Sequence, residues 1–68
     1  MRYAVIFEKA EKSFGAYVPD LPGCVAIGDS LAEAKTLIAA AMKQHLAELQ
    51  QGGHQPPEPA SIVAYIDA

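Results

Sequence analysis

The sequence is short of the groups that usually hold very small proteins together. It has 68 residues, no tryptophan and one cysteine, Cys24. A single cysteine excludes an internal disulfide and a cysteine-rich zinc site. His45 and His54 have no neighbouring pattern typical of a metal site. Because a chain of this size is near the limit for folding around an apolar core alone, we expect one domain over residues 1–68, without a cofactor, that self-associates as a homodimer or higher homo-oligomer.

Basic residues are also few. The chain has 5 Lys and Arg against 8 Asp and Glu, which gives a net charge of −3. The basic residues are scattered along the chain at Arg2, Lys9, Lys12, Lys35 and Lys43. Nucleic-acid affinity comes mostly from neutralising phosphates, so this pattern argues against direct nucleic-acid binding. It favours a basic protein as the partner.

Long apolar runs are missing as well. The longest run, Leu37 to Met42, is far too short to cross a membrane. The opening Met1-Arg2-Tyr3 leads straight into strand-like alternation and has no apolar signal core. A free thiol is typical of a reducing compartment. We therefore expect a cytoplasmic protein without membrane contact.

The residues that are present predict an α+β fold. Apolar residues make up 51% of the chain, and strand-like composition marks residues 3–8, 14–18, 24–27 and 61–66. Between the third and fourth of these, Ser30-Leu31-Ala32-Glu33 has capping-box spacing, in which the Ser30 hydroxyl accepts from the Glu33 N–H and the Glu33 carboxylate from the Ser30 N–H. Apolar residues then recur every three or four positions until Gly52-Gly53 ends the helix. The order β-β-β-α-β predicts a four-stranded sheet with one helix packed on one face.

Two of the predicted strands are apolar on both faces. The first has Tyr3, Val5 and Phe7 on one face, and Ala4 and Ile6 on the other. The last has Ile62, Ala64 and Ile66 opposed to Val63 and Tyr65. Such strands are typically covered on both sides. One helix covers only one side, so a second copy is the expected cover for the other.

Two runs of the sequence resemble the HicB antitoxin family. The first extends from Phe14 to Cys24 and contains Pro19-Asp20-Leu21-Pro22-Gly23; the second extends from Gly28 to Ala34. The resemblance implies a partial ribonuclease H-like sheet, in which the fourth strand returns beside the first. It also implies that the chain binds and blocks a HicA-like toxin, a small basic protein that cleaves mRNA. Many members carry a further DNA-binding domain, but residues 1–68 contain no segment of that kind, so the family's autoregulation is not carried over to them.

The resemblance and the charge together indicate a binding module that neutralises the toxin by steric occlusion. The residues expected to contact the partner are Tyr17, Asp20, Leu21, Pro22, Gly23, Asp29 and Glu33. The proline, aspartate and glycine of this set have an equally good structural explanation, because they favour a tight turn. The alternative function is an oligomeric structural or interaction domain with another partner and no cognate toxin.

Catalysis has weak support in the sequence. A metal-dependent nuclease needs several carboxylates around one metal pair, and only Glu8 and Asp67 lack a turn or capping explanation. Cys24 has no base beside it, and His45 falls on the apolar stripe of the helix. We therefore interpret both as structural residues and the chain as not an enzyme.

Overall fold

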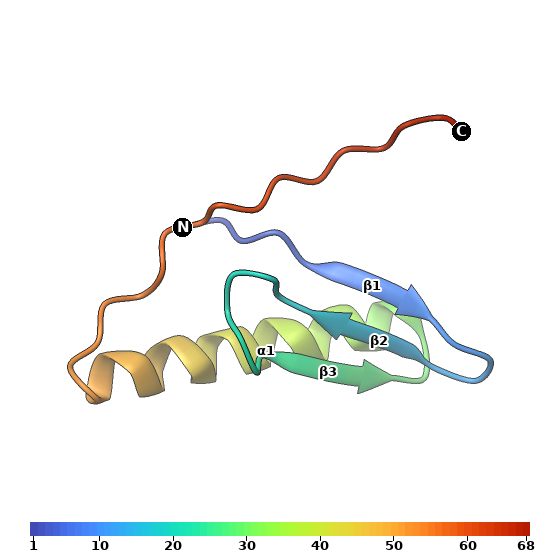
Figure 1. Ribbon diagram of the computed structural model, residues 1–68. Helices are drawn as coiled ribbons and strands as arrows, with labels where there is room; N and C mark the ends of the chain where they lie inside the picture. Colours follow the sequence, from blue (N-terminus) through green and yellow to red (C-terminus); the bar gives the residue numbers. More distant parts are fainter.

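Three short strands and one long helix form the structure, a computed structural model that describes residues 1–68. The strands are β1 (Ile6–Lys9), β2 (Phe14–Tyr17) and β3 (Val25–Gly28), and the helix α1 spans Leu31–Gln51. The strands form one antiparallel sheet in the order β1-β2-β3, and α1 lies along one face of it (Figure 1). The α+β class, the three antiparallel strands and the single helix are thus confirmed, although each strand is shorter than or slightly displaced from its predicted range.

The register of the sheet assigns each strand residue to a face. Phe7, Ala16 and Ala26 are cross-strand partners, and partners directly opposite share a face. Ala16 is buried and the other two are half-buried, so this row faces the helix. The neighbouring row, which faces away from α1, consists of Ile6, Tyr17 and Val25.

The core lies between the sheet and the first half of α1. It is built from Ala16, Val18, Leu21, Cys24 and Ile38, and Leu21 is the largest side chain that is completely buried. Only 7 of the 68 residues are buried. A core this small provides little stabilisation by burial, which agrees with the expectation from chain length.

Both ends of α1 are held by local hydrogen bonds. At the start, the Ser30 Oγ accepts from the Glu33 N–H at 3.0 Å, as predicted, but the Glu33 Oε1 accepts from Asp29 N at 2.8 Å rather than from Ser30 N. The carboxylate therefore reaches one residue further back than a capping box requires. At the end, Gly53 has φ 76°, and the N–H groups that follow Gly52 bond back to the last turn. This is the Schellman arrangement that glycine makes accessible.

One glycine sets how closely the helix approaches the sheet. A Cβ built on Gly28 would lie 2.6 Å from the backbone N of Ala34. The end of β3 and the first turn of α1 are thus in backbone contact, and any side chain at position 28 would separate them. Gly28 and Ala34 are both buried, so this contact fixes the position of the first helical turn against the end of β3.

The predicted fourth strand is absent, and this prediction was wrong for the single chain. Residues 61–68 are extended but pair with no strand, and Figure 1 shows them leaving the body of the molecule beyond β1. Their β-branched and aromatic composition favours pairing, but composition does not supply a partner. The ribonuclease H-like sheet that the family resemblance implied is not supported by the structure, which has three strands.

Candidate interaction surfaces

The turn between β2 and β3 is closed by its own backbone. Leu21 N donates to Val18 O at 3.0 Å, Cys24 N to Leu21 O at 3.0 Å and Val18 N to Cys24 O at 3.2 Å. The Leu21 side chain is 0% exposed, so it belongs to the core and not to the surface in this conformation. Pro22 and Gly23 are exposed at the tip, and Gly23 has φ 85°, which favours glycine. Pro22 and Gly23 are therefore the predicted contact residues of this turn that are exposed to a partner.

Asp20 holds the segment that follows the helix. Its carboxylate accepts hydrogen bonds from Ala60 N at 2.9 Å, from Ser61 N at 2.9 Å and from Ser61 Oγ at 2.8 Å. These bonds, first of all that from the Ser61 N–H, hold the pKa of Asp20 below its ordinary value near 3.8. The carboxylate predicted to meet a partner therefore already has an internal structural role.

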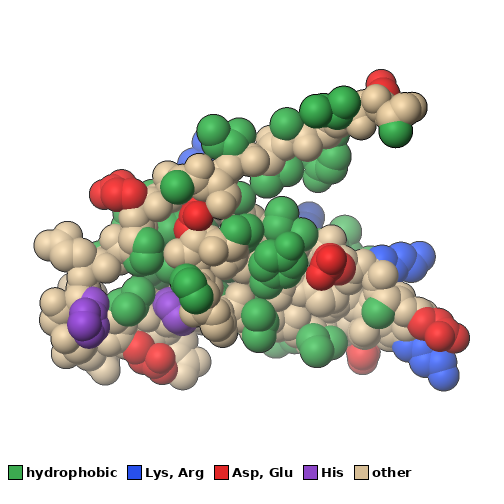
Figure 2. All heavy atoms as spheres, viewed as in Figure 1, with side chains coloured by type: hydrophobic (Ala, Val, Ile, Leu, Met, Phe, Trp, Pro, Cys, Tyr) green, Lys and Arg blue, Asp and Glu red, His purple; other side chains and the backbone are tan.

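An apolar surface covers the side of the sheet that faces away from α1. We call it the open sheet face and define it by Ile6, Tyr17, Val25 and Ile27. Val25 is 64% exposed, Ile27 72% and Tyr17 39%, and Figure 2 shows hydrophobic side chains over this part of the molecule. Glu8 stands in the same row as Ile27, with Gly15 between them. The open sheet face therefore combines exposed apolar groups with a carboxylate.

The acidic residues at the helix start lie at the other end of the sheet. Tyr17 pairs with Val25, whereas Asp29 follows Gly28, which pairs with Phe14. These positions are three residues apart along β2, or about 10 Å at the rise of a strand. The predicted partner residues therefore form two groups, one at the Tyr17 turn and one at Asp29 and Glu33, joined by the open sheet face. Asp29 and Glu33 are exposed, although Glu33 is also engaged in the cap.

No group of three or more His, Cys, Asp or Glu side chains is arranged to hold a metal ion. Glu8 lies in β1 and Asp67 in the unpaired segment 61–68. Cys24 is a free thiol that is 3% exposed, and burial raises its pKa. A raised pKa reduces the thiolate that a nucleophile needs, which supports the structural interpretation of Cys24.

The comparison with known families decides what kind of protein carries these surfaces. The sequence model described as HicB-like antitoxin of bacterial toxin–antitoxin systems matches residues 3–68. The chain belongs to the HicB-like antitoxin family. The resemblance seen in the turn and the capped helix is thereby confirmed over nearly the whole chain, and an antitoxin role is supported.

A curated relative is similar over almost the same range. It is an uncharacterised 14.9 kDa protein from the rep–hol intergenic region of Haemophilus phage HP1 (strain HP1c1), 31% identical over 67 residues, which are 98% of this chain. The chain spans about half the length of that relative, 50%. No solved structure gives a significant match. In the structure, no helix has both the length and the apolar character that crossing a membrane requires.

Sequence reasoning missed two features of these surfaces. The sequence predicts a strand at Val25 and Ile27 but does not single them out as contact residues. The alternation of large and small residues from Val25 to Gly28 was the available signal, because it leaves the large side chains on one face. The bonds of Asp20 to Ala60 and Ser61 had no signal, since they join residues about forty positions apart.

Proposed function

We propose that this chain is a non-catalytic antitoxin that binds a HicA-like, mRNA-cleaving toxin and covers its active surface. Family membership supports the antitoxin role. The observation that carries the proposal is the open sheet face, on which Val25 and Ile27 are 64% and 72% exposed beside a carboxylate. The toxin's substrate is mRNA, so the proposed place of encounter is the cytoplasm.

The composition of the open sheet face suits a protein partner. Interface centres are rich in aromatic and apolar groups and poor in charge, whereas their rims are polar. Tyr17, Val25 and Ile27 provide such a centre, and Glu8 provides a charge at its edge. The chain carries a net charge of −3, and a protein that handles RNA tends to be basic. Complementary charge of this kind accelerates encounter and fixes orientation.

The proposed mechanism of inhibition is occlusion. Apolar and acidic side chains would occupy the toxin surface on which RNA phosphates otherwise lie, and no group of the antitoxin takes part in chemistry. A standard interface covers about 800 Å² on each partner, which is enough to include the open sheet face and both ends of the sheet. Pro22 and Gly23 at one end, and Asp29 at the other, would then lie at the rim of the same interface. Asp20 and Glu33 would contribute indirectly, Asp20 by tying the turn to Ala60 and Ser61 and Glu33 by holding the helix start.

Co-expression with a HicA-like ribonuclease encoded beside this chain tests the proposal. The wild-type chain should relieve growth arrest and copurify with the toxin. Ile27→Arg places a like charge in the centre of the open sheet face and should abolish both effects. Ala40→Arg makes the same change in charge on the exposed side of α1 and should leave both intact.

Two outcomes would contradict the proposal at different levels. Unrelieved growth arrest with no copurifying complex would remove the antitoxin function. A complex that tolerates Ile27→Arg as well as Ala40→Arg would keep the function but place the toxin elsewhere. Association kinetics add a third comparison: Glu8→Lys should slow association and reduce its salt dependence, whereas Glu48→Lys, the same change on the helix, should have less effect.

A further inference from the structure

Residues 61–68 contain the three most exposed large hydrophobic side chains of the chain. Ile62, Tyr65 and Ile66 are 92%, 96% and 90% exposed. Figure 2 shows hydrophobic side chains along the arm that extends from the body of the molecule. The side chains alternate so that Ile62 and Ile66 point to one side and Tyr65 to the other. Exposure of so many apolar side chains to water is unfavourable. The segment is therefore expected to be covered by a partner.

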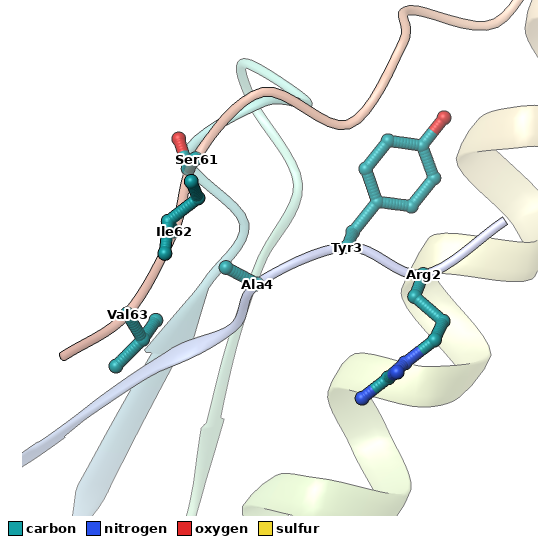
Figure 3. A pocket seen from close by; sticks show the side chains of 6 residues that line it. All are labelled: Arg2, Tyr3, Ala4, Ser61, Ile62 and Val63. Carbon is teal, nitrogen blue, oxygen red and sulfur yellow. The ribbon is translucent and has the colours of Figure 1, made fainter.

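The base of this segment is fixed rather than free. The Asp20 carboxylate holds Ala60 and Ser61, and the Tyr3 hydroxyl donates to Pro57 O at 2.6 Å. Beyond Ser61 the segment crosses its own N-terminal residues without pairing. A groove of about 490 Å³, lined by Arg2, Tyr3, Ala4, Ser61, Ile62 and Val63, separates the two stretches (Figure 3). The hydrogen bonds at the base therefore direct an unpaired strand away from the chain's own β1 (Figure 1).

The outer edge of β1 is unpaired and could accept this segment. This strand pairs with β2 on one side and with nothing on the other. Unpaired edges present rows of N–H and C=O groups that readily accept another strand. The core-facing residues before and within β1, Tyr3, Val5 and Phe7, pack against the core but are only half-buried. An added strand would complete the cover of these side chains.

We propose that two copies of this chain exchange residues 62–66, each copy adding this segment as a fourth strand to the β1 edge of the other. Every copy carries both the unpaired segment and the unpaired β1 edge. A reciprocal exchange pairs the segment of each copy with the β1 edge of the other and gives a closed two-fold dimer. The two-sided apolar character of the segment then has a physical reason. One side joins the core beside Tyr3, Val5 and Phe7, and the other extends the open sheet face beside Ile6.

Sedimentation equilibrium from low to high micromolar concentration, without toxin, tests the exchange. The wild-type chain should have twice its 7.2 kDa mass. Val63→Pro and Ala64→Pro, made separately, remove neighbouring N–H groups that point to opposite edges of the segment, so one of the two must lie in the new ladder. That variant should raise the dimer dissociation constant by about a hundredfold or more. Val25→Lys alters the open sheet face but not the segment and should leave the dimer intact. A monomeric wild-type chain, or a dimer lost with Val25→Lys but kept with both proline variants, would overturn the proposal.

Disulfide trapping separates exchange from closure within one chain. Ala4→Cys is combined with either Val63→Cys or Ala64→Cys, which point to opposite sides of the segment, and the double variants are oxidised. The native Cys24 is 3% exposed and does not compete. Exchange predicts covalent dimers on a non-reducing gel for one of the two pairs. Covalent monomers alone would show that the segment folds onto its own β1, and the absence of any crosslink would also refute the exchange. Both results are independent of toxin binding, so failure here leaves the proposed antitoxin function untouched.

Discussion

Substitution of Gly28 is the sharpest test of the contact between β3 and α1. An alanine Cβ would lie 2.6 Å from Ala34 N, 3.0 Å from Ala34 Cα and 3.1 Å from the carbonyl carbon of Glu33. The shortest of these is 0.8 Å less than the 3.4 Å at which ordinary contact begins. All three atoms belong to the backbone of the first helical turn. No side chain can rotate away, so the helix must move relative to the sheet.

The cost follows from two opposing effects. Overpacking of this kind costs about 1–3 kcal/mol. Gly28 has no positive φ, so alanine also restricts the unfolded chain and returns about 0.4–1 kcal/mol. We expect Gly28→Ala to lower the free energy of unfolding by about 1–2 kcal/mol, a large part of the roughly 3–5 kcal/mol that a core of this size supplies.

Urea unfolding of Gly28→Ala and Gly15→Ala provides a matched comparison. Gly15 lies in β2 of the same sheet, but the nearest atom to its added Cβ is Glu8 O at 4.0 Å. With a slope of about 1 kcal/mol/M, the midpoint should fall by about 1–2 M for Gly28→Ala and stay nearly unchanged for Gly15→Ala. Both must be measured at one protein concentration, because self-association shifts apparent stability. Equal midpoints for the two variants would refute the close approach of β3 and α1.

Three further predictions concern other local contacts. Ser30→Ala should lower the free energy of unfolding by about 1 kcal/mol in the same urea assay, because the Glu33 N–H loses its cap; an unchanged midpoint would contradict the helix start. The pKa of Asp20 is lowered in the folded state, so its bonds to Ala60 and Ser61 are fully present above the ordinary value near 3.8 and are lost as pH falls through the lower folded value. The amide NMR shifts of those two residues should report that transition, and a midpoint at or above the ordinary value would contradict it. Cys24 should react with a thiol reagent only after unfolding, and rapid labelling of the native protein would refute its burial.

The sequence predicts local structure correctly where the interacting groups are close along the chain. The helix start was predictable because Ser30 and Glu33 are three residues apart, and the helix end because glycine accepts the positive φ of Gly53. The Pro19–Gly23 turn was equally accessible. The detail that Glu33 bonds Asp29 N instead of Ser30 N depends on the entry angle of the chain, which spacing does not encode.

Features that depend on distant partners could not be read in the same way. The composition of residues 61–66 indicates that they can form a strand. Which strand they pair with depends on the path of the chain after α1, which composition does not predict. That path depends on Asp20, whose bonds to Ala60 and Ser61 no local pattern reveals. Leu21 shows the opposite difficulty. It stands in a polar turn among predicted contact residues, yet its side chain is 0% exposed, because the turn folds back over the core.

The burial of Leu21 has a consequence for recognition. Its N–H and C=O are both bonded within the turn, and its side chain anchors the turn from below. Pro22 and Gly23 are therefore presented on a loop that is already ordered before any partner arrives. Binding usually loses free energy to the freezing of mobile loops and side chains. The backbone of Pro22 and Gly23 loses its conformational entropy during folding, before a partner binds. A partner that contacts these two residues therefore gains affinity with little further loss of conformational entropy.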